Sequence, residues 1–169
     1  MKIPTSIKDR VEIATNILIA VVILMIGTTY LKSHTGHHEA SLSPGEQINA
    51  PHGYKWRNHD QTLVVAVRKG CVYCERSYSL YRRLDCLEHS NTLKAHMLVV
   101  MPDDPASGAE LLRSQQITSQ SIPDTPLGDV KVSGTPTLLL VDANGRLLQS
   151  WVGELDSSKA EALVAQLRR

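Results

Sequence analysis

Apolar and polar positions along residues 60–168 predict strands and helices in turn. Three short runs are continuously apolar and rich in valine and leucine, which is typical of buried strands; they cover residues 62–67, 96–101 and 137–141. Three stretches with helical spacing cover residues 72–89, a segment beginning at Pro105, and a segment from Asp156 or Ser157 to Arg168. On the second of these helices, Ala109, Leu112 and Gln116 are expected to share one side.

Turn-forming residues separate the remaining elements. Residues 142–145 (DANG) predict a tight turn between the third strand and a further strand over residues 146–152, so that the two form a hairpin. Residues 45–48 can pair as a short segment at the start of the folded part, and a brief extended piece is expected near residues 129–132. The order is then strand, helix, strand, helix, strand, strand, helix, which is an α/β arrangement.

The N-terminal region carries an uncharged apolar segment over residues 13–31. As a helix it would be about 28 Å long, close to the ~30 Å hydrocarbon core of a bilayer. Lys2, Lys8 and Arg10 precede it, which predicts a cytoplasmic N-terminus. The alternative is a cleaved signal peptide, but the segment is longer than the usual apolar region and no small-x-small cleavage site follows it.

We therefore expect a cytoplasmic N-terminus over residues 1–12, a single uncleaved transmembrane anchor over 13–31, a linker over 32–53 and a folded domain over 54–169. The protein would then lie in the inner (cytoplasmic) membrane, with its C-terminal domain facing the periplasm or the cell exterior. Cysteines in such a compartment face oxidising conditions.

Length and charge narrow the function classes. The 169 residues suffice for one ordinary domain with appendages. The net charge is +1, with 18 basic and 17 acidic residues, and no dense basic stripe is present. This balance gives no support to nucleic-acid binding.

Candidate chemistry is concentrated in the pair Cys71 and Cys74, which directly follows the first predicted strand and begins the first predicted helix. The unpaired N–H groups at a helix N-terminus stabilise a thiolate, the attacking species in disulfide exchange. A second cysteine three positions later can resolve a mixed disulfide. The spacing thus favours redox chemistry over a purely structural disulfide. It also favours it over a zinc site, which needs four ligands although no second such pair exists.

Three motifs in order resemble the thioredoxin family, above all its membrane-tethered, extracytoplasmic thioredoxin-like and redoxin members of bacteria. They are residues 69–74 (KGCVYC), 132–137 (VSGTPT) and 141–146 (VDANGR). The resemblance covers about residues 45–169. It implies a thioredoxin-like fold, with a central mixed β-sheet flanked by helices after the single N-terminal transmembrane helix, and a thiol-disulfide oxidoreductase without a bound cofactor.

The resemblance also implies the roles of the site residues. Cys71 would be the attacking thiol and Cys74 the resolving one, and the Thr135–Pro136 bond would be cis beside them. The backbone of Thr135 would then face a substrate chain, which can pair with it as a short added strand. The expected partners are protein thiol and disulfide substrates, together with a membrane electron donor if the protein acts as a reductase.

The sequence departs from the common thioredoxin pattern at three places. No tryptophan precedes Cys71, Tyr73 stands where a proline often precedes Cys74, and the strand over residues 62–67 contains no buried acid to accept a proton. Arg68 and Lys69 could lower the pKa of Cys71 electrostatically. Glu75 could relay protons, although an ordinary solvated acid in a first helical turn explains it equally well.

Other functions are less well supported. A metal-handling protein for copper or zinc could combine the dithiol with the linker histidines, His34, His37 and His38. The composition of the linker instead favours solvated histidines without a metal. A redox-inert thioredoxin-like adaptor is a further alternative. A peroxidase is less favoured, because Arg68 occupies the position at which peroxide-reducing redoxins carry threonine. Cys86, the third cysteine, is expected to be a small buried apolar residue.

Overall fold

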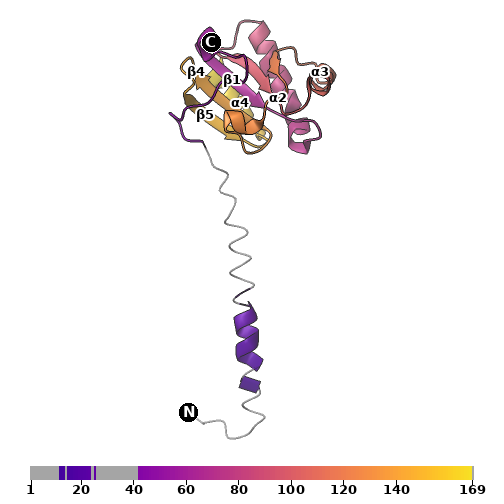
Figure 1. The fold of residues 1–169 in the computed structure, drawn as a ribbon, viewed down its shortest axis with the longest axis vertical. Coiled ribbons are helices and arrows are strands. Elements are labelled where there is room, and N and C mark those ends of the chain that lie inside the picture. The colour runs from indigo at the N-terminus through magenta and orange to yellow at the C-terminus, as the bar shows by residue number, and fades with distance from the viewer. Residues whose placement is uncertain (1–11, 14, 24, 26–41, 169) are drawn as a thin grey trace. The chain divides into compact units, whose positions relative to one another are not determined.

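A five-stranded mixed sheet frames the larger of the two units into which the chain divides, residues 40–169 (Figure 1). The computed structural model describes residues 12–13, 15–23, 25 and 42–168. The strands lie in the order β3-β2-β1-β4-β5. Their bounds are β1 Gln61–Ala66, β2 His96–Val100, β3 Gln120–Ile122, β4 Thr137–Asp142 and β5 Leu147–Val152. β1, β2 and β3 pair in parallel, whereas β4 pairs antiparallel with both β1 and β5.

The helices follow the strands in the predicted order. They are α2 Val72–His89, α3 Pro105–Ser114 and α4 Ser157–Leu167, with short 3-10 helices η1 Trp56–Asn58 and η2 Leu127–Val130. Side chains of Asp104 and Asp156 accept backbone N–H groups at the starts of α3 and α4. Such caps satisfy N–H groups that a helix leaves unpaired, which explains why both helices begin where they do.

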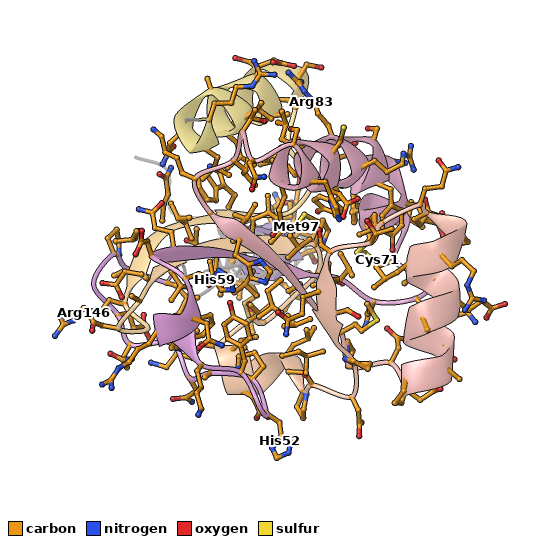
Figure 2. The ribbon with its side chains drawn as sticks, turned by 90° about the horizontal axis from the view of Figure 1, so that it is seen from above. His52, His59, Cys71, Arg83, Met97 and Arg146 are labelled. Carbon is orange, nitrogen blue, oxygen red and sulfur yellow. A yellow bond between two sulfur atoms is a disulfide. The ribbon has the colours of Figure 1, made fainter. Side chains whose placement is uncertain are left out.

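Central strand β1 is buried on both faces, because its side chains alternate between two hydrophobic clusters. Leu63 and Val65 pack in one cluster with residues of α2, α3 and α4, while Val64 and Ala66 pack in the other, which includes Ile48 and Trp56. This double burial explains the continuous apolar run in the sequence. Figure 2 shows Met97 of β2 in the interior and Arg146 and His52 at the surface.

Residues before β1 belong to the folded unit. Gln47 pairs with Arg146, as the predicted pairing segment requires, and Gly45 donates its N–H to the carbonyl of Leu147 at 2.7 Å. Ile48 is fully buried. Packing therefore begins ahead of residue 54.

Two local expectations are wrong. The extended piece near residues 129–132 is not a strand: its first two residues belong to η2, and the edge strand β3 is formed instead by Gln120–Ile122. On α3 the buried residues are Gly108 and Leu112, whereas Ala109 is exposed; Gln116 is also exposed and lies beyond the end of the helix at Ser114. A Cβ atom on Gly108 would lie 2.6 Å from Met101 Sδ, so a glycine lets this face approach the sheet.

The smaller unit, residues 1–39, includes described residues 12–13, 15–23 and 25, which are helical. Large apolar side chains are exposed there, including Ile17, Leu18 and Ile23. Among the described residues, no helix combines the length and apolar character needed to cross a membrane. The predicted anchor extends over residues 14, 24 and 26–31, which lie outside the described residues, as do most of the predicted N-terminus 1–12 and His34, His37 and His38.

A polar cluster joins the C-terminal end of α2 to the beginning of β2. His96 Nδ1 lies 2.6 Å from Glu88 Oε1, its Nε2 lies 3.0 Å from Gln120 Oε1, and its ring stacks on that of His59 at 3.9 Å. The hydrogen bond with Glu88 raises the pKa of His96. Burial alone would raise the pKa of Glu88, but hydrogen bonds from His96, the Met97 N–H and the Ser119 hydroxyl lower it.

These opposite shifts define a pH window for the His96–Glu88 pair. The His96 contribution is complete below its ordinary pKa of 6.5 and is lost as the pH rises through the raised folded value. The Glu88 contribution is complete above its ordinary pKa of 4.5 and is lost as the pH falls through the lowered folded value. The pair thus stabilises most between these two ordinary values.

We predict that His96→Gln lowers the free energy of unfolding more near pH 5.5 than near pH 8.5. The measurement is urea unfolding at both pH values, in a His59→Asn background so that the stacked ring does not offset the effect. His52→Gln, at an exposed histidine outside the cluster, should show no such pH dependence. An equal loss at both pH values for His96→Gln would contradict the prediction.

Candidate active site

Cys71 and Cys74 form a disulfide at the start of α2, with their Cα atoms 5.2 Å apart. Cys71 is the N-cap residue in an extended conformation, and its Sγ accepts a hydrogen bond from the backbone N–H of Cys74 at 3.1 Å. Gly70, immediately before the pair, has a φ of +71°, which favours glycine at this turn. The local sequence therefore places the first sulfur at the positive end of the helix dipole.

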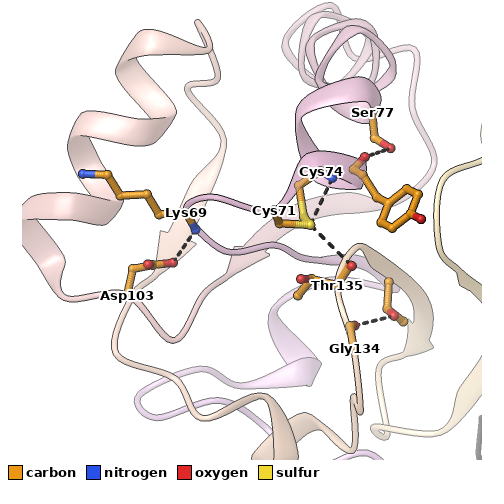
Figure 3. The surroundings of a disulfide bond; sticks show 9 residues. Lys69, Cys71, Cys74, Ser77, Asp103, Gly134 and Thr135 are labelled. Atoms are coloured by element: carbon orange, nitrogen blue, oxygen red, sulfur yellow. Dashed lines mark hydrogen bonds between the residues drawn. A yellow bond between two sulfur atoms is a disulfide. The ribbon is translucent and has the colours of Figure 1, made fainter.

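The register of the sheet brings the second motif to the same place. Ala66 at the end of β1 pairs with Thr137 at the start of β4, directly after Pro136. The Thr135–Pro136 peptide bond is cis, as predicted. Cys71 Sγ lies 3.4 Å from the carbonyl oxygen of Thr135 (Figure 3). Because a disulfide sulfur carries no hydrogen, this is a van der Waals contact in the oxidised form.

The proline segment is held by its neighbours on both sides. The hydroxyl of Thr137 donates to the carbonyl of Gly134 at 2.9 Å, and the N–H of Gly153, just beyond β5, donates to the carbonyl of Pro136 at 2.8 Å. These bonds fix the segment that faces Cys71, so the contact with Thr135 is built into the sheet rather than into a free loop.

The two sulfurs are buried unequally, and the residues between them are exposed. Cys71 retains 6% of its surface and Cys74 none. In contrast, Val72 and Tyr73 are 55% and 56% exposed. The Tyr73 ring lies under the guanidinium of Arg76, 5.6 Å from its centroid. An incoming group can therefore approach Cys71 across an apolar surface, whereas Cys74 is covered.

Lys69, which was expected to support negative charge on Cys71, pairs its own charge with a carboxylate. The Lys69 ammonium pairs with Glu110 at 3.4 Å, and its backbone N–H donates to Asp103 Oδ2 at 3.0 Å. The positive side chain is thus paired with a carboxylate of α3. Figure 3 shows the Lys69–Asp103 bond, which fixes the loop that leads into the dithiol.

The sequence predicts that Tyr78 covers the partly buried side of α2, which the structure confirms, but it does not indicate a role for this residue at the dithiol. Tyr78 lies one turn after Cys74 on α2 and belongs to the same hydrophobic cluster as both cysteines. Within the described part of the chain, its hydroxyl is the one buried side-chain nitrogen or oxygen without a hydrogen-bond partner. Burial, then the charges of Glu75 and Asp103, raise the pKa of Tyr78 to about 12. In the sequence, the four-residue spacing between Cys74 and Tyr78 is the signal that indicates that both side chains lie on one face of the helix.

Two further candidate residues, Glu75 and Cys86, are exposed on α2. Cys86 is an exposed free cysteine, so the expectation that it is buried is wrong: it faces solvent on α2, whose inward positions are taken by residues such as Tyr81 and Leu84. Among the described residues, no group of three or more histidine, cysteine, aspartate or glutamate side chains could hold a metal ion.

Comparison with known proteins shows similarity in structure. No protein-family model and no curated protein sequence matches the chain. Among solved structures, the chain resembles a proposed thiol:disulfide interchange protein DsbE from Chlorobium tepidum, with 19% identity, a TM-score of 0.59, and coverage of 75% of this chain and 96% of that one.

Two further solved structures are similar to the chain in fold. A thiol:disulfide interchange protein from Bacteroides sp. has 14% identity and a TM-score of 0.53, covering 74% of this chain and 90% of that one. A thiol-disulfide isomerase from Corynebacterium glutamicum has 14% identity and a TM-score of 0.53, covering 76% and 95%. The chain therefore has the thioredoxin-like fold that its three motifs predicted, and it carries a Cys71–Cys74 pair within it.

We predict that Thr137→Val lowers the free energy of unfolding of the oxidised protein by about 1 kcal/mol, because it removes the hydrogen bond to Gly134 in a buried place. Valine suits a strand, so backbone preference does not add to the loss. Urea unfolding measures the change. The control is Ser121→Ala at an exposed serine of β3, for which a change within about 0.5 kcal/mol is expected. Equal losses for both variants would argue against a role of this bond.

Proposed function

We propose that this protein is a thiol-disulfide oxidoreductase that exchanges electrons with cysteines of protein substrates through Cys71 and Cys74. The observation that carries the proposal is the disulfide at the start of α2, with the less buried sulfur in contact with the Thr135 carbonyl. The names of similar structures, which include thiol:disulfide interchange proteins and a thiol-disulfide isomerase, support it.

The reaction begins when a substrate thiolate attacks the Cys71 sulfur. A bond forms between the two sulfurs, the Cys71–Cys74 bond breaks, and its electron pair leaves on Cys74. A second substrate thiolate then attacks the substrate sulfur of the mixed disulfide and releases Cys71 as a thiolate. The substrate dithiol has lost two electrons and two protons, and the cysteine pair has gained them. The reverse sequence reduces a substrate disulfide.

The residues of the site have separate roles in this scheme. The helix N-terminus and the Cys74 N–H stabilise negative charge on Cys71. The backbone at Thr135 pairs with an extended substrate segment. The exposed side chains of Val72 and Tyr73 contact apolar groups beside the substrate cysteine. No step requires a bound cofactor.

The test uses the full chain, purified in detergent, in glutathione buffers followed by thiol trapping. The wild-type pair should cycle between oxidised and reduced forms within about −120 to −300 mV, and the protein should accelerate insulin reduction. Cys71→Ser should abolish both. Cys74→Ser should accumulate mixed disulfides through Cys71, whereas the control Cys86→Ser should behave as wild type.

Three outcomes would overturn the proposal. A pair that never cycles in this range would favour a redox-inert adaptor. Stoichiometric metal that is lost on Cys71→Ser would favour metal handling. Partners trapped through Cys86 alone would show that the roles of the cysteines are wrongly assigned.

We further propose that residues 13–31 anchor the protein in the inner membrane, with residues 1–12 in the cytoplasm and the folded unit on the outer side, where a membrane electron donor could serve it. The uncharged segment and the exposed apolar side chains of its described helical residues support this. A membrane would cover side chains such as Ile19 and Val22.

The anchor predicts that the full-length protein stays in the membrane pellet after alkaline carbonate extraction and is digested by protease added to spheroplasts. Ile19→Lys combined with Val22→Lys should reduce membrane retention, because each lysine costs about 2.5–3.5 kcal/mol at the centre of a spanning helix. Leu148→Lys, on the folded unit, is the control and should be retained. A mature protein that lacks residues 1–31 by mass spectrometry would show a cleaved signal peptide instead.

A further inference from the structure

The hydroxyl of Tyr78 is a buried polar group without a partner beside the dithiol. The side chain is 2% exposed, and its hydroxyl makes no hydrogen bond within the described structure. A buried donor without an acceptor is destabilising, and such groups are rare in folded proteins. The oxidised state therefore leaves this hydrogen-bond donor unused.

The position of the hydroxyl follows from the helix. Residues four apart share a helix face, and long side chains lean toward the N-terminal turn, so Tyr78 covers the turn that contains Cys74. The carboxylates of Glu75 and Asp103 act on its phenol, and both lie at the dithiol end of α2. Asp103 itself accepts the N–H of Lys69, two residues before Cys71.

Reduction creates the acceptor that the oxidised state lacks. When the disulfide opens, Cys74 becomes a buried sulfur with a free electron pair, surrounded by the apolar side chains of its cluster. The residues of β1 in this cluster are Leu63 and Val65, and neither side chain can form a hydrogen bond to the sulfur. An unpaired thiolate in such a place is strongly disfavoured.

We propose that the Tyr78 hydroxyl donates a hydrogen bond to the Cys74 sulfur once the disulfide opens, and that this bond sets the redox equilibrium of the pair. The inference rests on the proposed function. The phenol keeps its proton, since its pKa of about 12 lies above the ordinary value of a thiol, about 8.5. Tyr78 thus stabilises the leaving sulfur by hydrogen bonding in the first step of exchange, without a change in the balance of electrons and protons.

Tyr81 provides a matched control. It is equally buried on the same helix, and its ring meets that of Tyr78 edge to face at 5.9 Å. Within the described part of the chain, however, its hydroxyl is not a buried group without a partner, whereas that of Tyr78 is. Removal of either hydroxyl therefore changes the same cluster by one oxygen atom, but only the Tyr78 hydroxyl is buried and unpaired in the oxidised state.

The experiment compares full-length wild type, Tyr78→Phe and Tyr81→Phe in glutathione buffers. Tyr78→Phe should shift the equilibrium about tenfold toward the disulfide, because the reduced form loses a hydrogen bond to a charged or polarisable sulfur. Tyr81→Phe should leave it within about twofold of wild type. In a Cys71→Ala background, the Cys74 thiol should titrate at higher pH when Tyr78 is replaced by phenylalanine.

A structural role of the Tyr78 hydroxyl would make Tyr78→Phe lower the urea stability of the oxidised form. We expect instead that Tyr78→Phe keeps or increases this stability, because the hydroxyl has no partner in the oxidised form. In the wild-type protein, the ¹³Cζ resonance of Tyr78 should move on reduction and that of Tyr81 should not. This second measurement tests the inference even if a variant fails to fold.

Three results would each overturn the inference: an unchanged thiol–disulfide equilibrium for Tyr78→Phe, an equal shift for Tyr81→Phe, or a Tyr78 ¹³Cζ resonance that does not move on reduction. If the wild-type pair does not cycle at all, the proposed function itself fails. If the wild type cycles and Tyr78→Phe matches it, only the role of Tyr78 is lost.

Discussion

The position of the dithiol depends on the burial of β1 on both of its faces. Its side chains fill two hydrophobic clusters, so the strand can stand only in the middle of the sheet, between β2 and β4. The antiparallel register with β4 then sets Thr137 opposite Ala66. Two motifs separated by about sixty residues in sequence thereby meet at one end of the sheet. Long-range geometry at the site is a consequence of packing in the core.

Main-chain groups make the polar contacts of Cys71 at this end of the sheet. Cys71 Sγ contacts the N–H of Cys74 and the carbonyl oxygen of Thr135. The nearby ion pair Lys69–Glu110 is largely exposed, and exposed pairs contribute little. Backbone dipoles, in contrast, are fixed by the helix and the sheet and need no reorganisation when charge develops on sulfur.

Much of the fold could be predicted from the sequence because its signals are local and strong. The observed α2 has the predicted bounds, 72–89, and three predicted strands agree to within one residue at each end. The cis bond at Pro136 followed from the motif order through the family resemblance. A helix that starts at a cysteine pair and a strand that is buried throughout leave few alternative assignments of secondary structure.

The remaining features depend on tertiary contacts that sequence patterns do not encode. Gly108 is buried on α3, where a Cβ would lie 2.6 Å from Met101 Sδ, and glycine has no hydrophobic periodicity to reveal this. β3 is short and polar, and it becomes a strand only because β2 offers it an edge. Cys86 is small and apolar, but its angular position on α2 turns it to solvent. The unpaired hydroxyl of Tyr78 depends on which neighbours surround it in space.

Residues 45–48 pair at the end of the sheet that lies away from Cys71. These residues pair with the beginning of β5, beside the end of β4, whereas Cys71 faces the beginning of β4. At about 3.4 Å per residue, the strand places these two points roughly 17 Å apart. Residues 45–48 thus lie at one end of the sheet and Cys71 at the other. If Cys71 exchanges disulfides as proposed, a substrate segment can reach it without contact with residues 45–48.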